Sequence, residues 1–306
     1  MKTRLGIFVI CLLLLPMAGY GLSGGADFPN ENTAENTAEP LSVPLYFSAQ
    51  FTATLLTSFA LIAYILLANH LIRLRTGSSP LNVQGRYFLV MGVAGAVLGW
   101  LLVYLNYFAA SWRSESGDPV WSVLISTLLF ALLTPAVLST RALLGSFTGL
   151  LKLLARGVIL PAPGDETLVY SLMPLAVLGL LGGAAWPAHL YGLLWLAPLL
   201  LLVALQLLWN QATIFSGLKS GDWGRVICVA LAGIITCNFA MLAYQLSGGS
   251  VEINLPHPLF AQFGYAVFGL LCQQLGDVVA EHWRGVRRDK PQSKKKFPID
   301  VVVKKS

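Results

Sequence analysis

Three polar side chains interrupt the last long apolar run of the chain, which extends from Pro258 to Arg284. Gln273 and Asp277 are four residues apart, and Gln274 is three residues before Asp277, so on a helix all three can face one groove. A carboxylate is costly to bury in lipid and commonly serves ion, proton or headgroup handling. Because Asp277 lies within one to two helical turns of Trp283, the alternative is an interfacial or structural role.

Other amides occur in neighbouring apolar runs. Gln206, Asn210 and Gln211 end the fifth run, and Asn238 and Gln245 lie in the sixth. We expect them to form hydrogen bonds between helices, worth about 1 kcal/mol each. If they face the same groove as Gln273, they would instead line a polar pocket.

The four histidines divide evenly between the two predicted sides of a membrane. His70 and His282 fall on one side, and His189 and His257 fall on the other. Two b-type haems would need one pair of histidines on each side, so haem b is an alternative cofactor hypothesis. No pair shares a helix at haem-like spacing, and interfacial histidines usually need no ligand. We therefore expect no cofactor and no metal.

Motifs of soluble enzymes are missing from the sequence. It contains no HExxH, GxSxG, P-loop, paired aspartate-rich prenyl-diphosphate or GxGxxG motif. Its four cysteines form no CxxC pair. An active site, if there is one, must be built from helix ends and span interiors, so whether the protein is an enzyme stays open.

The composition indicates that these polar residues and histidines are carried by helices in a membrane. Hydrophobic residues make up 56% of the 306 residues and charged residues only 11%, against about 25% charged in soluble proteins. A soluble core could not hide that much apolar surface, whereas a bilayer can. The net charge of +6 lies in short loops and a tail, which favours a membrane protein over a nucleic-acid-binding one.

Residues 1–26 have the pattern of a secretory signal peptide. Lys2 and Arg4 form a basic start, Leu5–Met17 is a short apolar stretch, and Gly24 and Ala26 are small residues suited to cleavage. An uncleaved anchor is the alternative. Residues 27–45 follow as an acidic, polar segment with a repeated ENTA motif, which predicts a disordered periplasmic tether.

Residues 46–284 are predicted to form an all-α, polytopic membrane bundle of seven transmembrane helices. Each apolar run is long enough to cross about 30 Å of hydrocarbon. Glycine stripes in the second and fourth runs predict close helix contacts. The predicted spans are 46–70, 87–110, 119–140, 168–187, 189–210, 225–247 and 258–282.

The distribution of basic residues predicts the orientation. Of the 20 Lys and Arg residues, only Arg113 falls on the same side as the acidic tether. The positive-inside rule then places the mature N-terminus outside and the C-terminus in the cytoplasm. We expect a bacterial-type inner membrane. The basic tail, 285–306, would enforce this topology and attract anionic lipid rather than nucleic acid.

A basic amphipathic helix is predicted at 141–158, between the third and fourth spans. Arg141, Lys152 and Arg156 fall on one narrow face, and Leu and Phe fill most of the remaining positions. Such a helix suits the surface of an anionic leaflet. With Arg225 in the next loop on this side, these residues are candidates for contact with lipid headgroups or a small anion. A plain structural connector is the alternative.

One stretch also carries a family resemblance. The GDWGRV turn at Gly221–Val226, followed by PLFAQFGYAVFGLL at Pro258–Leu271, resembles the C-terminal part of some uncharacterised bacterial multi-spanning membrane proteins. The resemblance covers about the last third of the chain and implies no activity. The acidic and Trp-rich positions of that group's sixth span are replaced here by Cys237–Ala240, so no site residue is transferred.

Three functional hypotheses follow. The first, which the short loops and missing motifs favour, is an accessory or scaffolding subunit that binds other membrane subunits. The second is a carrier or membrane enzyme for a lipid-phase or anionic small molecule, using Gln273, Gln274 and Asp277. The third is a haem-bearing electron carrier.

Overall fold

The computed structural model describes residues 49–114, 119–159, 164–255 and 257–284. Within them, seven helical spans are long and apolar enough to cross a membrane, which confirms the predicted all-α polytopic membrane fold. The predicted signal sequence, tether and basic tail lie outside the described residues. The spans are α2 (Ala49–Thr76), α4 (Gly85–Ala109), α5 (Pro119–Gly145), a composite fourth span (Asp165–Ala185), α9 (Pro187–Leu208), α10 (Gly224–Leu246) and α11 (Pro258–Arg284).

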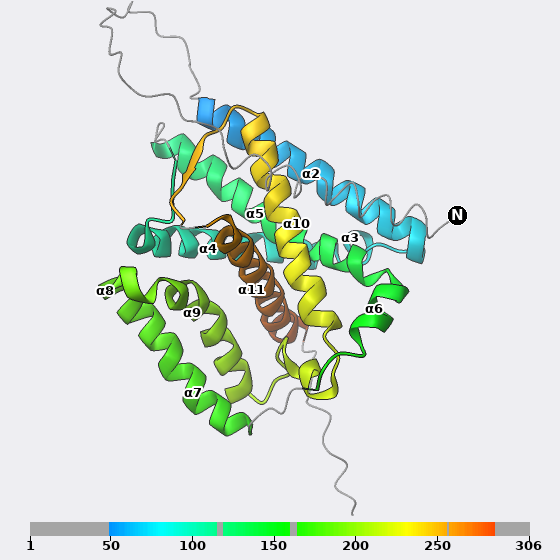
Figure 1. Cartoon of the computed structure of the whole chain (residues 1–306). Coiled ribbons are helices and arrows are strands. Elements are labelled where there is room, and N and C mark those ends of the chain that lie inside the picture. Colours follow the sequence, from blue (N-terminus) through cyan, green and yellow to red (C-terminus); the bar gives the residue numbers. More distant parts are fainter. Residues whose placement is uncertain (1–48, 115–118, 160–163, 256, 285–306) are drawn as a thin grey trace, which may run out of the picture.

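Helix α11 occupies the centre of the bundle (Figure 1). It packs against α10 and α5 on one side and against α9 on the other, and α4 also contacts it. The largest buried apolar cluster follows this central position, because it joins Leu271 of α11 to Val203 of α9 and Ala232 of α10. Helix α11 is therefore placed between the α2–α5–α10 group and the hairpin of the fourth span and α9 (Figure 1).

Glycines allow the central helices to approach closely. A Cβ atom added at Gly233 of α10 would lie 2.2 Å from the carbonyl oxygen of Tyr265 and 2.7 Å from Cα of Gly269, both on α11. The predicted stripes behave in the same way: a Cβ at Gly95 would lie 2.5 Å from Oγ1 of Thr134 on α5, and one at Gly183 would lie 2.7 Å from Cβ of Leu194. Backbones in contact bring polar side chains within reach of the neighbouring helix.

The fourth span is not a uniform α-helix. It consists of α7 (Asp165–Val177), a π-helical turn η1 (Leu178–Gly182) and α8 (Gly183–Ala185). Pro174 lies inside α7 and has no N–H group to donate, which weakens the regular hydrogen-bond ladder there. The span packs mainly against α9, so α7 and α9 form a hairpin at one side of the bundle (Figure 1).

Nearly all of the described basic residues lie at one end of the bundle, either in its loops or in the helix ends next to them, and we call this end the basic end. It is formed by residues 77–84, 146–159 and 209–223, which include α3 (Pro80–Val83), α6 (Thr148–Leu154) and the 3₁₀ helix η2 (Ser216–Ser220). At the opposite end, β1 (Trp112–Ser114) pairs antiparallel with β2 (Val251–Ile253).

The amphipathic helix predicted at 141–158 is divided in the structure. Helix α5 continues to Gly145, and α6 starts only at Thr148. Arg75 of α2 stabilises the turn between them, because its Nε donates to Oγ of Ser146 (2.8 Å) and its guanidinium lies 3.9 Å from the ring centroid of Phe147. Arg141 therefore belongs to the end of a span, whereas Lys152 belongs to a short separate helix.

Hydroxyl groups join three of the spans in what we call the hydroxyl node. Thr140 of α5 donates to the carbonyl of Ala136 (2.8 Å) and lies 2.7 Å from the hydroxyl of Tyr64 on α2 and 3.0 Å from that of Thr236 on α10. Since the single Thr140 hydrogen is used within α5, Tyr64 and Thr236 must both donate to Thr140. All three residues are buried.

Candidate functional site

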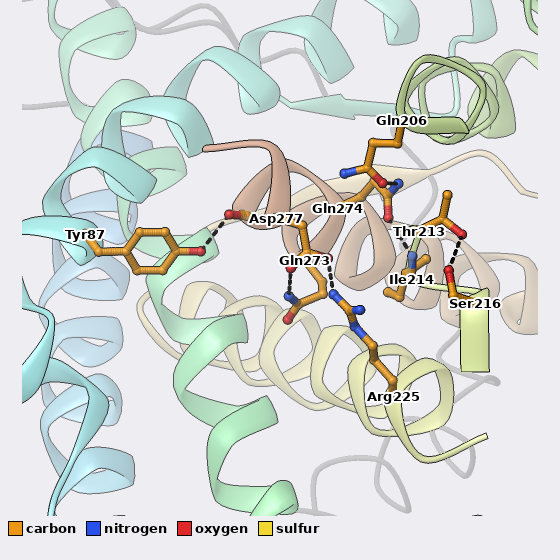
Figure 2. Close-up of polar contacts among 10 residues, drawn as sticks. Tyr87, Gln206, Thr213, Ile214, Ser216, Arg225, Gln273, Gln274 and Asp277 are labelled. Atoms are coloured by element: carbon orange, nitrogen blue, oxygen red, sulfur yellow. Dashed lines mark hydrogen bonds and ion pairs between the residues drawn. The ribbon is translucent and has the colours of Figure 1, made fainter. Parts of the chain in front are cut away.

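Asp277 lies at the centre of a buried polar cluster on α11. Only 3% of its surface is exposed, so it does not reach interfacial water. Arg225 of α10 forms an ion pair with it, and Gln273 donates to its Oδ1 at 3.0 Å. Figure 2 shows Arg225 extending from α10 toward Gln273 and Asp277. Two of the three residues predicted to share one face of this helix, Gln273 and Asp277, are thus in direct contact.

Gln274 is buried as well but has a different set of partners. Its Nε2 donates to Oε1 of Gln206 on α9, and its Oε1 accepts from the backbone N–H of Ile214 at 3.2 Å. These contacts lie toward α9 and the loop that follows it (Figure 2). We refer to Gln206, Arg225, Gln273, Gln274 and Asp277 together as the α11 cluster.

Local structure explains how each partner reaches α11. Arg225 lies in the first turn of α10, just after a turn in which the carboxylate of Asp222 accepts from the Gly224 N–H at 2.9 Å. Beyond Gln206, α9 ends and the chain turns at Asn210, whose φ of 55° lies in the left-handed region that Asn tolerates. This turn brings Ile214 back over Gln274.

Helix α4 also contacts this part of α11. The hydroxyl of Tyr87 donates to the backbone carbonyl of Gly276 at 3.0 Å. A Cβ atom at Gly276 would lie 2.6 Å from that hydroxyl oxygen, so the contact requires glycine. The region around the α11 cluster therefore connects α4, α9, α10 and α11.

Among the glutamines of the α11 cluster, Nε2 of Gln206 and Oε1 of Gln273 have no hydrogen-bond partner among the described residues. Rotating the Gln273 amide by 180° would turn its oxygen toward the Asp277 carboxylate. Rotating the Gln206 amide would place its NH₂ group against the NH₂ group of Gln274, and two donors cannot bond to each other. Rotating the Gln274 amide as well would avoid this clash, but Gln274 would then lose its hydrogen bond from the Ile214 N–H. Unused hydrogen-bonding capacity is therefore inherent in this arrangement, and a buried polar atom in that state is unfavourable.

The four basic residues predicted to contact lipid or a small anion are not one group. Arg225 is turned inward to Asp277. Arg141 is partly buried near the end of α5, whereas Lys152 and Arg156 are exposed in and just after α6. The positive-inside pattern could place Arg225 at the correct end but could not identify its partner, which lies 52 residues away.

The histidines show no convergence in the described structure. His70, His189 and His257 are exposed, and His257 accepts the Leu259 N–H through its Nδ1 at 3.2 Å. The side chain of His282 lies outside the described residues. In the part of the chain that the structure describes, no group of three or more His, Cys, Asp or Glu side chains is placed to hold a metal ion. The haem hypothesis stays a prediction.

Some of the predicted amides do join helices. Gln206 contacts Gln274, and Asn238 exchanges two hydrogen bonds with Gln262 of α11, at 2.7 and 3.0 Å. Sequence reasoning missed Glu281, which is buried four residues after Asp277 on α11. The four-residue spacing was the signal that could have found it.

Comparison with known proteins gives no relative for this chain: no family model, no curated protein and no solved structure matches it. The resemblance of the last third to bacterial multi-spanning proteins stays a prediction. Function must therefore be argued from the α11 cluster and the fold around it.

Proposed function

We propose that this integral membrane protein is an accessory or scaffolding subunit of a membrane complex in a bacterial-type inner membrane. The observation that carries the proposal is the internal pairing of Asp277, the strongest candidate for chemistry, with Arg225 and Gln273. The ion pair joins α10 to α11, as expected of a group that fixes helix positions. The short described loops leave no room for a soluble catalytic domain.

The proposal includes an orientation, with the mature N-terminus outside and the C-terminus in the cytoplasm. It is supported by the basic end, because cytoplasmic loops carry an excess of Lys and Arg. Among the described residues, Arg113 alone stands at the opposite end. The cations at or near the basic end are Arg73, Arg75, Arg86, Arg141, Lys152, Arg156, Lys219 and Arg225.

Native mass spectrometry of the full chain, gently extracted from its own membrane, tests this function. Co-purifying subunits, with no small molecule bound other than membrane phospholipid, are the expected result. The Asp277→Asn variant should show unchanged expression and an unchanged phenotype, with the same subunits attached. A wild-type protein that carries a stoichiometric small molecule other than phospholipid, and no other subunit, would overturn the accessory function.

A second candidate function is a carrier or membrane enzyme for a lipid-phase or anionic small molecule. The observation in its favour is the unused capacity at Gln206 Nε2 and Gln273 Oε1, since a ligand atom could satisfy either group. In that case Asp277→Asn would abolish activity while expression and assembly stayed normal. Replacing Gln262, an amide of α11 with its own partner in Asn238, by Leu is the matched control and should leave activity in place.

A further inference from the structure

The corner between α5 and the segment after α6 presents cations together with exposed apolar side chains. Helix α6 packs inward through Leu150, Leu151 and Leu154, which contact the main apolar cluster. The opposite side of the segment faces away from the bundle. We call this surface the α6 corner, and its residues are Arg141, Lys152, Leu153, Arg156, Val158 and Ile159.

The cations of the α6 corner have no acceptor inside the described part of the chain. No side-chain hydrogen bond and no ion pair joins Arg141, Lys152 or Arg156 to any described residue. Other cations at this end are engaged: Arg75 binds Ser146, and Lys219 forms an ion pair with Asp165 at 3.3 Å. Arg141 is also partly buried, which makes an unmatched guanidinium less favourable than it would be in water.

The apolar side chains of the corner are strongly exposed. Leu153, Val158 and Ile159 have 72%, 73% and 64% of their surface accessible. They are also held in place, because the indole N–H of Trp223 donates to the carbonyl of Val158 at 2.8 Å and the Gly157 N–H donates to Gly221 at 3.0 Å. A fixed surface with adjacent cationic and apolar groups matches a ligand that has an anionic head and a hydrocarbon body.

We propose that the α6 corner binds an anionic phospholipid. Lys152, in the last turn of α6, and Arg156, just after the end of that helix, contact the phosphate oxygens. Arg141 lies at the end of the adjacent span and adds a third cation facing the headgroup region. Leu153, Val158 and Ile159 lie against the acyl chains. The site requires only that the bundle spans a membrane, so it stands whether the protein is a subunit or a carrier.

The test is a lipid titration of the full-length protein in neutral detergent, followed by native mass spectrometry. The probe is phosphatidylglycerol, with zwitterionic phosphatidylcholine as the reference lipid. One basic residue near anionic lipid is worth about 1 kcal/mol, or roughly fivefold in affinity. The double variant Lys152→Gln/Arg156→Gln should therefore bind phosphatidylglycerol roughly 25-fold more weakly, with phosphatidylcholine binding unchanged.

A matched control is the double variant Arg73→Gln/Arg86→Gln. It removes two exposed cations from the same end of the bundle, and so lowers the general positive charge by the same amount while leaving the α6 corner intact. Its phosphatidylglycerol affinity should stay within about twofold of the wild-type value, since long-range attraction alone is screened by salt. Equal losses in both double variants would show diffuse attraction and overturn a defined site.

Two further experiments distinguish a phospholipid ligand from a soluble phosphate. Inorganic phosphate at 10-fold molar excess over lipid should not displace phosphatidylglycerol, because it lacks the acyl chains that contact Leu153 and Ile159. Displacement by phosphate alone would identify a soluble anion as the ligand and contradict the lipid site. The Ile159→Ser variant, which keeps all the cations, should weaken phosphatidylglycerol retention, and unchanged retention would likewise count against the proposal.

Discussion

The hydroxyl node and the α11 cluster are both buried polar groups between helices, yet they differ in how fully their hydrogen-bonding atoms are paired. In the node, Thr140 uses its one hydrogen within α5 and accepts from Tyr64 and Thr236, so its donors are all satisfied. In the α11 cluster, an ion pair and three amide hydrogen bonds still leave atoms of Gln206 and Gln273 without partners. A neutral, completed network fits a purely structural contact, whereas an incomplete, charged one retains capacity to bind something else.

Breaking the ion pair should have the largest effect. In the Arg225→Met variant, Asp277 would stay buried without its cation, and we expect a loss of about 3–5 kcal/mol in unfolding free energy. Chemical unfolding in mixed micelles measures it. The double variant Arg225→Met/Asp277→Leu removes both charges and should recover most of the loss. A loss of under about 1 kcal/mol in the single variant would show that the charged α11 cluster is no more sensitive to losing a partner than the neutral hydroxyl node.

The hydroxyl node should give a smaller effect. Thr140→Val keeps the side-chain shape but removes the acceptor that Tyr64 and Thr236 share, so unfolding should become easier by about 1–2 kcal/mol. Thr54→Val is the matched control, because the Thr54 hydroxyl is also buried but bonds only within α2, to Gln50. Equal costs for the two variants, measured in the same micelles, would mean that the node does not couple the helices.

The smallest effect is expected at Gln206. The Gln206→Met variant removes a buried N–H group that has no described partner, and this gain offsets the loss of the acceptor for Gln274. Unfolding free energy should change by under about 0.5 kcal/mol. Gln274→Met should cost about 1 kcal/mol or more, because the Ile214 N–H would lose its acceptor. A larger loss of unfolding free energy for Gln206→Met than for Gln274→Met would contradict this expectation.

The helices of this protein could be predicted from sequence because lipid imposes a strong constraint. Every backbone polar group must be satisfied within the membrane, so long apolar runs form helices of a length set by the bilayer. The glycine stripes were equally readable, since Gly95 and Gly183 permit contacts that a larger residue would block. These features depend on local composition alone.

The site was predicted only in part, because its partners are distant in the chain. Gln273 and Asp277 could be placed together from helical spacing, but the inward turn of Arg225 depends on how α10 packs on α11. The hydroxyls of Tyr64, Thr140 and Thr236 gave no signal, since Ser and Thr in a span commonly bond to their own helix. The break after Gly145 was missed because its stabilising partner, Arg75, lies on α2.

The small sheet at the opposite end has a consequence for biogenesis. Its strand β1 ends at Ser114 and its partner β2 begins only at Val251, so roughly 140 residues must be synthesised before the two can meet. At about 5–20 residues per second, this delay lasts roughly 7–30 s. During that interval, the third, fourth, fifth and sixth spans leave the ribosome while the loop that carries β1 still lacks its partner strand. Pairing of β1 with β2 would then mark a late step, when the sixth span has joined the spans inserted before it.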